Sequence, residues 1–245
     1  MPYSPALQTN KMANKKSKRY LQAAEKIEAG KGYPLAEAVT LLKSLPAPKF
    51  DGTVTLSFKL GIDPRKSDQM VRGSVALPHG TGKTVRVIVF ATGDAAKAAE
   101  DAGADIVGMD DLIKKVSDGF LDFDAAIATP DAMKEVRKIA RVLGPRGLMP
   151  NPKTGTVTDD TAKAINAVKA GKIDYKVDKN GSVAAAVGKV SFDEAKLTEN
   201  AASLIESLVK SKPASAKGDY IQSATLCSSM LPGIALEQSL YVINQ

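Results

Sequence analysis

The stretch from residue 84 to residue 143 alternates strand patterns with helix patterns at short spacing, and this alternation restricts the fold more than any other feature of the chain. The run "TVRVIVFAT" at 84–92 is almost continuously apolar, which is typical of a strand in a sheet covered on both faces. Further patterns follow in the order helix, strand, helix, strand and helix, at 94–103, 105–109, 111–119, 123–130 and 131–143. Such alternation predicts parallel strands joined by right-handed crossovers. We therefore predict a Rossmann-like α/β unit, closed by a helix from about Asp160 to Ala170.

The two flanking segments have a different pattern. Before the alternating stretch, "YPLAEAVTLLKSL" at 33–45 has helical spacing, and strand patterns follow at 53–62 and 70–77. After it, "KIDYKVDKNGSVAAAVG" predicts two strands joined by a turn at "DKNG". A long amphipathic helix, a strand at 219–230 and an irregular tail come last. Neither segment has enough elements for a core of its own.

The chain is therefore predicted to form two domains, of mixed α/β and α+β type. Residues 1–80 and 172–245 together form an α+β sandwich, and residues 81–171 are inserted into it as the Rossmann-like domain. Three glycines lie at the two crossings between the domains and are natural hinge points: Gly80, Gly82 and Gly171.

The N-terminus has no recognisable sorting signal. "MPYSPALQTNK" has neither the apolar segment of a signal peptide nor the Arg-rich amphipathic face of a transit peptide. No apolar run approaches the roughly 20 residues that a transmembrane helix needs. We therefore expect a cytoplasmic protein with no membrane partner. Residues 1–20 are expected to be flexible, and translation starts at Met1 or at Met12, where a segment typical of a natural N-terminus begins.

The excess of basic residues is confined to the first third of the chain. The formal net charge is +7, and residues 1–80 hold 13 Lys or Arg against 6 Asp or Glu. Residues 81–171 hold 13 against 13, and residues 172–245 hold 8 against 8. A basic segment attached to neutral ones indicates a polyanionic partner on one face. The alternative is a solvated lysine-rich surface.

Catalytic and metal-binding patterns are absent from the sequence. The one cysteine, Cys227, cannot form an internal disulfide, and with one histidine, His79, the usual zinc ligands are missing. Cys227 is expected to be a small buried residue of a strand, and His79 a turn residue. "GTGKT" at 80–84 resembles the end of a P-loop, but Leu77 stands where the motif needs glycine and a strand pattern follows. We predict no metal, cofactor or catalytic residue; the alternative is an enzyme whose Rossmann-like insert binds a nucleotide.

Long motifs in a consistent order link the chain to a known family. They are "KFDGTV" at 49–54, "LGIDPRKSDQMVRGSVALPHGTGK" at 60–83, "DFDAAIATPD" at 122–131, "LGPRGLMPNPKTGTV" at 143–157 and "AGKIDYKVDKNG" at 170–181. From about Lys15 to Gly233, the sequence resembles the bacterial-type L1 family of large-subunit ribosomal proteins. The resemblance implies that the domain formed by both chain ends binds large-subunit ribosomal RNA at a mobile stalk. It further implies that the inserted domain swings as deacylated transfer RNA leaves the exit site, and that the protein, a monomer when free, represses translation of its own messenger RNA.

The resemblance also implies where RNA is bound. The family's RNA-contacting residues correspond here to Lys49, Phe50, Arg65, Lys66, Lys176, Asp178, Lys179, Ser223, Ser229 and Met230. Basic side chains suit phosphates, hydroxyls suit ribose 2′-OH groups, and apolar side chains suit sugar and base surfaces.

Three of these residues keep a second interpretation. Phe50 and Met230 are alternatively core residues, and Asp178 alternatively serves only its turn. The family usually has glycine where this chain has Leu231, and the larger side chain is expected to crowd a close approach of RNA to the backbone.

The prolines and glycines of "LGPRGLMPNPKTGTV" at 143–157 predict a rigid surface loop. Its basic residues Arg146 and Lys153 are secondary candidates for contact with RNA. The final residues, from Ile234, do not resemble the family's usual end.

Overall fold

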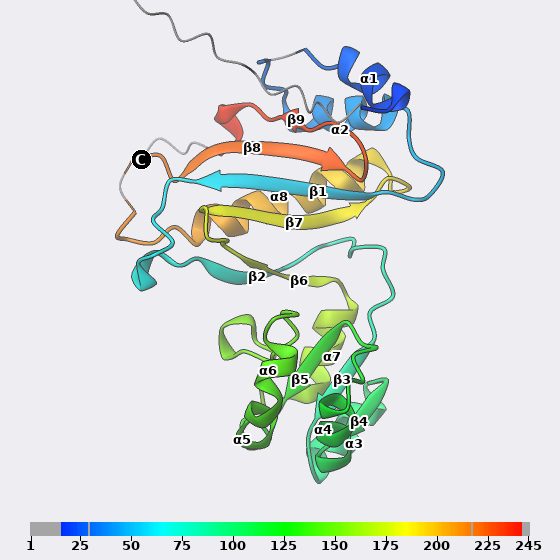
Figure 1. The fold of residues 1–245 in the computed structure, drawn as a ribbon, viewed down its shortest axis with the longest axis vertical. Helices are drawn as coiled ribbons and strands as arrows, with labels where there is room; N and C mark the ends of the chain where they lie inside the picture. Colours follow the sequence, from blue (N-terminus) through cyan, green and yellow to red (C-terminus); the bar gives the residue numbers. More distant parts are fainter. Residues whose placement is uncertain (1–15, 29, 217, 242–245) are drawn as a thin grey trace, which may run out of the picture.

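The computed structural model describes residues 16–28, 30–216 and 218–241, and within them the strands form three separate sheets (Figure 1). One sheet has four strands, one has two and one has three. The chain is thus a mixed α/β protein. No helix among the described residues is long and apolar enough to cross a membrane.

Both ends of the chain contribute to the four-stranded sheet. Its order is β7 (Ser182–Lys189), β1 (Thr53–Leu60), β8 (Ile221–Ser228) and β9 (Ile234–Ala235), and every neighbouring pair is antiparallel. The strand patterns at 53–62 and 219–230 thus predicted elements that the structure contains.

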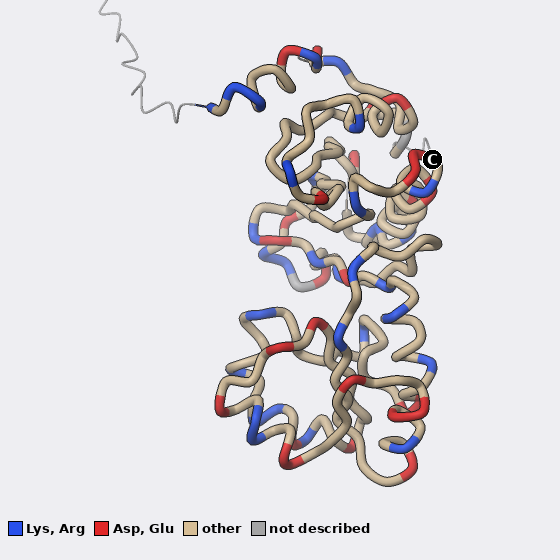
Figure 2. Tube along the Cα trace, turned by 90° about the vertical axis from the view of Figure 1, so that its right-hand side faces the viewer, with Lys and Arg blue, Asp and Glu red and all other residues tan. Residues whose placement is uncertain are grey.

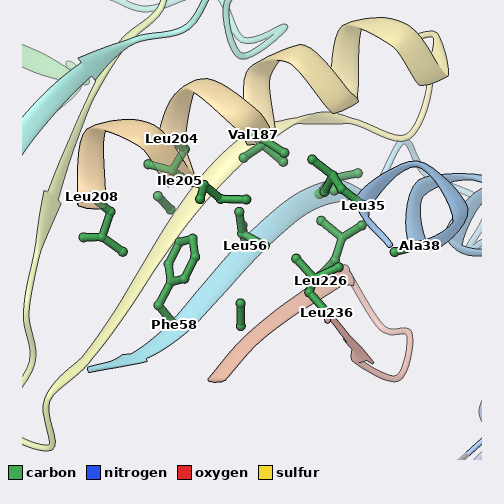
Figure 3. Close-up of a cluster of buried hydrophobic side chains, with 14 of the residues drawn as sticks. Leu35, Ala38, Leu56, Phe58, Val187, Leu204, Ile205, Leu208, Leu226 and Leu236 are labelled. Atoms are coloured by element: carbon green, nitrogen blue, oxygen red, sulfur yellow. The ribbon is translucent and has the colours of Figure 1, made fainter. Parts of the chain in front are cut away.

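Two helices, α2 (Leu35–Ser44) and α8 (Glu194–Lys210), cover one face of this sheet. Alternate residues of β1 point to that side, and Leu56 and Phe58 pack with Leu204 of α8 (Figure 3). In Figure 1, α8 lies behind the strands, so the view looks onto the opposite face. Alternation along β1 therefore gives the sheet one covered and one open face.

The three-stranded sheet lies within the inserted segment. Its order is β4 (Ile106–Gly108), β3 (Val87–Phe90) and β5 (Ala125–Ala128), and both pairs are parallel, as predicted. All four residues of β3 are buried. The apolar run of β3 is thus explained by helices on both faces of the sheet.

Alternate residues of β3 belong to two different core clusters. Val87 and Val89 face α3 (Asp94–Asp101) and α7 (Thr161–Lys169). Ile88 and Phe90 face α4 (Asp110–Ser117) and the helical segment that follows β5. No member of either cluster belongs to the core cluster of the four-stranded sheet.

The remaining two strands form a pair between the two larger sheets. β2 (Arg72–Ala76) and β6 (Lys172–Lys176) are antiparallel, with Arg72 opposite Lys176. These strands lead into and out of the inserted segment (Figure 1). Strand patterns in the sequence predicted both, but their pairing with each other was not predicted.

The helix predicted at 131–143 is broken. It consists of α5 (Met133–Val136), the 3-10 turn η2 (Arg137–Ile139) and α6 (Ala140–Leu143). Val136, Ile139 and Leu143 are all buried. Residues i and i+3 eclipse each other in a 3-10 turn, so Val136 and Ile139 lie on the same side of the helical segment, facing the core of the insert.

The expectation that residues 1–20 are flexible is wrong for the last residues of that range. Helix α1 (Lys18–Glu25) starts inside that range, where the Tyr20 N–H donates to Ser17 Oγ at 3.3 Å and caps the helix. Residues 1–15, and with them the choice between Met1 and Met12, lie outside the described residues.

The expected irregular tail is also wrong in part. Strand β9 pairs with β8, the Tyr33 N–H donates to the Ala235 carbonyl at 2.9 Å, and Tyr241 is buried in the core. A 3-10 turn, η4 (Gln238–Leu240), lies between them. A two-residue strand is too short to produce a recognisable period in the sequence.

Candidate nucleic-acid interface

The open face of the four-stranded sheet carries small polar side chains. On β1, Thr55, Ser57 and Lys59 alternate with the buried residues and lie on the uncovered side. The β8 residues opposite them are Cys227, Thr225 and Ser223. The surface is therefore flat, rich in hydroxyls and free of carboxylates over these three pairs.

One end of this face carries the predicted aromatic and methionine contacts. Phe50 is 55% exposed and Met230 is 67% exposed, so neither is a core residue. Lys49 is exposed beside Phe50. The Thr53 N–H donates to Ser229 Oγ at 3.1 Å, which joins the start of β1 to the segment after β8. The structure thus brings Phe50 and Met230 to the same end of the sheet.

The backbone around Met230 explains why its side chain is exposed. Its φ of 63° is the only positive φ of a non-glycine residue in the described part of the chain. The next residue, Leu231, is 9% exposed and belongs to the core. The expected crowding at Leu231 is therefore not what the structure shows, because its side chain points away from the surface.

The opposite end of the face carries most of the predicted cations. Arg65 and Lys66 are exposed in the loop before the 3-10 turn η1 (Ser67–Gln69), and Lys176 and Lys179 are exposed around the end of β6. In Figure 2, Lys and Arg positions lie with acidic ones along the left edge of the upper part, which corresponds to the front of Figure 1. Ser223 is exposed near this end, opposite Lys59.

Asp178 has a clear structural role in the turn at this end. Its Oδ1 accepts hydrogen bonds from the Asn180 and Ser182 N–H groups, both at 2.8 Å. These two bonds lower the pKa of the carboxyl group, and the bond from the Ser182 N–H has the larger effect. Asp178 therefore holds the turn, in which Gly181 has a positive φ of 76°. Its contact with RNA stays a prediction.

The predicted residues form two clusters rather than one. Thr53 adjoins Ser229 at one end of β1, while Lys59 pairs with Ser223 near the other. Six residues of a strand span about 20 Å. The row of hydroxyls from Thr55 to Ser57 connects the clusters.

Two cations of this surface were missed in the sequence. Lys59 projects from β1 and its ammonium donates to the Asn180 carbonyl in the turn of Asp178. Arg72 stands opposite Lys176 in the β2–β6 pair. The alternation of "TVTLSFKL" does place Lys59 on the exposed side with Thr55 and Ser57, and that signal identifies it.

Two of the three predicted hinge glycines, Gly80 and Gly171, lie where the two crossings touch, and Gly82 lies beside Phe192. Gly80, Gly82 and Gly171 have φ angles of 64°, 70° and 102°, which favour glycine. A Cβ on Gly171 would lie 2.3 Å from Gly80 Cα, so any side chain there would force the crossings apart.

A buried asparagine, which the sequence did not indicate, holds the first crossing. Asn200 of α8 is 0% exposed. Its Oδ1 accepts from the His79 N–H at 3.1 Å, and its Nδ2 donates to the carbonyls of Gly80 and Val187 at 2.9 and 2.8 Å. The crossing is thus fixed to both α8 and β7.

The residues considered for chemistry have ordinary surroundings. His79 is a turn residue whose Nε2 lies 2.5 Å from Glu199 Oε2. Cys227 lies on β8 as predicted, but it is half-buried on the open face, and burial raises the pKa of its thiol. In the described ranges, no three His, Cys, Asp or Glu residues are grouped as metal ligands. After "GTGKT" the next element is β3, which removes the helix that a P-loop needs.

The loop at 143–157 is held by its own side chains. The Asn151 N–H donates to Thr156 Oγ1 and the Lys153 N–H donates to Asn151 Oδ1, both at 2.8 Å. The Ala128 N–H donates to the Thr156 carbonyl at 3.0 Å, which ties the loop to β5. Arg146 and Lys153 are exposed, and neither belongs to the two clusters on the open face.

Comparison with known proteins gives a matching family model and relatives that share more than half of their aligned residues with this chain. The family model described as "Ribosomal protein L1p/L10e family" matches residues 41–232. The chain is 57% identical over 226 residues to the large ribosomal subunit protein uL1 of Pseudarthrobacter chlorophenolicus, covering 92% of this chain and 96% of the relative. It is 59% identical over 223 residues to the protein of the same name from Streptomyces griseus, covering 91% and 93%.

Proposed function

The chain belongs to the ribosomal protein L1p/L10e family, and from this premise we propose that its open sheet face binds a folded region of large-subunit ribosomal RNA at the stalk. Membership of this family makes the protein a structural component of the large ribosomal subunit in the cytoplasm, and not an enzyme. The alternative of a nucleotide-binding enzyme is therefore dropped.

One observation carries the RNA proposal: exposed apolar side chains at one end of a hydroxyl-rich face and cations at the other. Phe50 and Met230 offer apolar surface for sugar and base atoms. Lys59, Lys176 and Lys179 offer charge for phosphates. Between them, the hydroxyls of β1 and β8 suit ribose 2′-OH groups, which distinguish RNA from DNA.

We further propose two domains, residues 1–80 with 172–245 and the inserted Rossmann-like residues 81–171. Separate core clusters support this division, as does the parallel sheet of the insert. Gly80, Gly82 and Gly171 would let the insert swing about the crossings, which suits a stalk that moves while deacylated transfer RNA leaves the exit site.

The basic surface of the insert supports transfer RNA as a partner of the moving domain. Residues 133–153 hold six Lys or Arg against one Glu, whereas the rest of 81–171 holds seven against twelve Asp or Glu. Arg137, Arg141 and Arg146 are exposed. The neutral total of the insert thus conceals a segment with net charge +5, which can attract a phosphate backbone.

Repression of its own messenger RNA is a second proposed function of the same open face. A surface that reads RNA shape and backbone binds any RNA that presents the same shape. Free monomer, not yet assembled, would then bind the message when ribosomal RNA is saturated. Competition between the two RNAs for one protein measures this: additive, independent binding contradicts a shared surface.

The main experiment separates the domains. A shortened chain can join residues 1–80 directly to 172–245 without a long linker, because Gly80 and Gly171 are already in contact where the two crossings meet. We expect it to keep its affinity for a stalk ribosomal RNA fragment and to lose affinity for transfer RNA. Loss of ribosomal RNA binding by a shortened chain that still folds would place the RNA site elsewhere.

The matched test of the insert uses the full chain. Arg137→Gln with Arg141→Gln should weaken transfer RNA binding and reduce its salt dependence by about one unit per lost phosphate contact. Lys114→Gln with Lys115→Gln removes the same charge from α4 and serves as control. Equal effects of both pairs would show only non-specific attraction.

A further inference from the structure

Met70 is an exposed apolar side chain outside the proposed set of RNA contacts. In the described part of the chain, four large hydrophobic residues are exposed: Leu21 at 48%, Phe50 at 55%, Met70 at 49% and Met230 at 67%. Phe50 and Met230 belong to the proposed RNA surface. Met70 lies at the other end of that surface, among its cations.

A groove of about 400 Å³ contains Met70. It opens between the segment 64–70, which contains η1, and the end of β6. Its lining residues are Pro64, Met70, Lys176, Val177, Asp178 and Lys179. The groove therefore combines apolar atoms with two ammonium groups.

The strand register explains why Met70 points outward. The Val177 N–H donates to the Val71 carbonyl at 3.1 Å, which continues the β2–β6 ladder by one residue. Val71 and Val177 are both buried in the core. Because side chains alternate along a strand, Met70 and Lys176 lie on the opposite, exposed side.

Hydrogen bonds fix both walls of the groove. On one side the Arg65 N–H donates to Asp63 Oδ1 at 3.1 Å and the Asp63 N–H donates to Gln69 Oε1 at 2.8 Å. On the other side Asp178 holds its turn through two backbone N–H groups. The groove is thus formed before any ligand arrives, which lowers the entropy cost of binding.

The charges of the groove favour an anionic ligand. Asp178 is the carboxylate in its lining, and that group is already engaged by its turn. Within residues 16–28, 30–216 and 218–241, Lys176, Lys179, Arg65 and Lys66 form no salt bridge. These cations are therefore available to phosphates on either side of an apolar floor.

We propose that this groove takes one unstacked nucleobase of the bound RNA, and this inference rests on the proposed RNA-binding function. The base lies against Met70 and Pro64, since a thioether and a proline ring offer polarisable apolar surface to a π face. The flanking phosphates pair with Lys176 and Lys179. A single nucleotide matches this combination of an apolar floor and a cationic rim.

The test uses the full chain and a stalk ribosomal RNA fragment. Met70→Ala should weaken binding by about 5- to 10-fold, the lower range for loss of one base contact, and should leave the salt dependence unchanged because no charge is removed. Leu21→Ala is the matched control, since its side chain is equally exposed and lies on α1. Met70→Gln keeps the length but not the apolar surface, and should also weaken binding.

Single abasic substitutions in the RNA identify the base. At one nucleotide, removal of the base should weaken wild-type binding and leave Met70→Ala binding unchanged. If the two effects add at every nucleotide, or if Met70→Ala binds like wild type, the groove takes no base. A Met70→Ala variant that binds RNA normally but is lost from assembled subunits would indicate a protein partner and overturn the proposal. Failure of wild type to prefer the stalk fragment over an unrelated RNA would instead overturn the proposed function itself.

Discussion

The four-stranded and three-stranded sheets differ in how many faces they bury. The sheet of the insert has helices on both sides, and every residue of β3 is enclosed. The sheet built from the two chain ends has helices on one side only, so Thr55, Ser57 and Lys59 stay accessible. A doubly covered sheet can present only loops and helices to a partner, whereas an open face presents a flat array of side chains. The comparison therefore favours the four-stranded sheet for the proposed contact with ribosomal RNA, and the helical surface of the insert for the proposed contact with transfer RNA.

The largest expected effects come from core substitutions that test whether the two sheets are independent. Phe58→Ala and Phe90→Ala each remove a fully buried ring and should each cost about 3–5 kcal/mol. We expect Phe58→Ala to lower the transition of the four-stranded part and abolish RNA binding. Phe90→Ala should lower the other transition and leave ribosomal RNA binding intact. Denaturant unfolding followed with and without RNA measures both; one shared transition would mean that the two parts fold as a single unit.

The next largest effect concerns the crossing that joins the two parts. Asn200→Ala leaves the His79 N–H and the Gly80 and Val187 carbonyls without their partner, and should cost about 1–3 kcal/mol. Glu199→Ala is the control, because its contact with His79 is exposed and should contribute below about 1 kcal/mol.

The same pair of variants tests the hinge. Distance distributions between labels on α8 and α4 should broaden in Asn200→Ala and not in Glu199→Ala. Unchanged distributions in both would mean that the glycines and the β2–β6 pair alone set the orientation of the insert.

Smaller effects on stability are expected for exposed side chains, whose removal should change RNA binding but not folding. Phe50→Ala and Met230→Ala should each weaken binding to the stalk fragment by about 10-fold while changing stability by no more than about 0.5 kcal/mol. Met230→Gly makes the test sharper, because it also removes the side chain but relieves the positive φ, and should raise the stability slightly. Variants that unfold instead would restore the core interpretation of these two residues.

Most of the fold was predictable because its elements have clear periods. The buried strand at β3, the alternation of β1 and the apolar face of α8 each produce a pattern that reports on local burial. The proposed site rests on family motifs alone, since nothing local in the sequence shows that residues near 50, 65, 178 and 230 lie on one face.

What the sequence did not reveal depends on long-range pairing. Asn200 holds the crossing through His79 and Gly80, which are 121 and 120 positions away, so its role as the anchor leaves no local signal. Likewise β9 is held by β8 and by Tyr33, and its two residues have no period of their own. The buried residues of 131–143, Val136, Ile139 and Leu143, keep helical spacing, so the sequence gives no sign of the 3-10 turn η2 that interrupts the helix.

The smallest expected effect compares two carboxylates, one in each part. The pKa of Asp178 is lowered by backbone N–H groups, and that of Asp124 mainly by the ammonium of Lys83. Both groups have folded pKa values below their unfolded value of about 3.9, so each stabilises the protein fully above that value. The contribution is lost as pH falls through the lower, folded pKa.

Salt and pH together distinguish the two carboxylates. Added salt screens the exposed Lys83–Asp124 pair but leaves hydrogen bonds to the backbone largely unchanged. We therefore expect the stability difference between wild type and Asp178→Asn to shrink below about pH 4 to the same extent at low and high salt. The difference for Asp124→Asn should shrink with salt even at neutral pH. Unfolding measured between pH 2 and 7 at two salt concentrations tests this, and a salt-sensitive Asp178 would mean that Lys59, not the turn backbone, holds its charge.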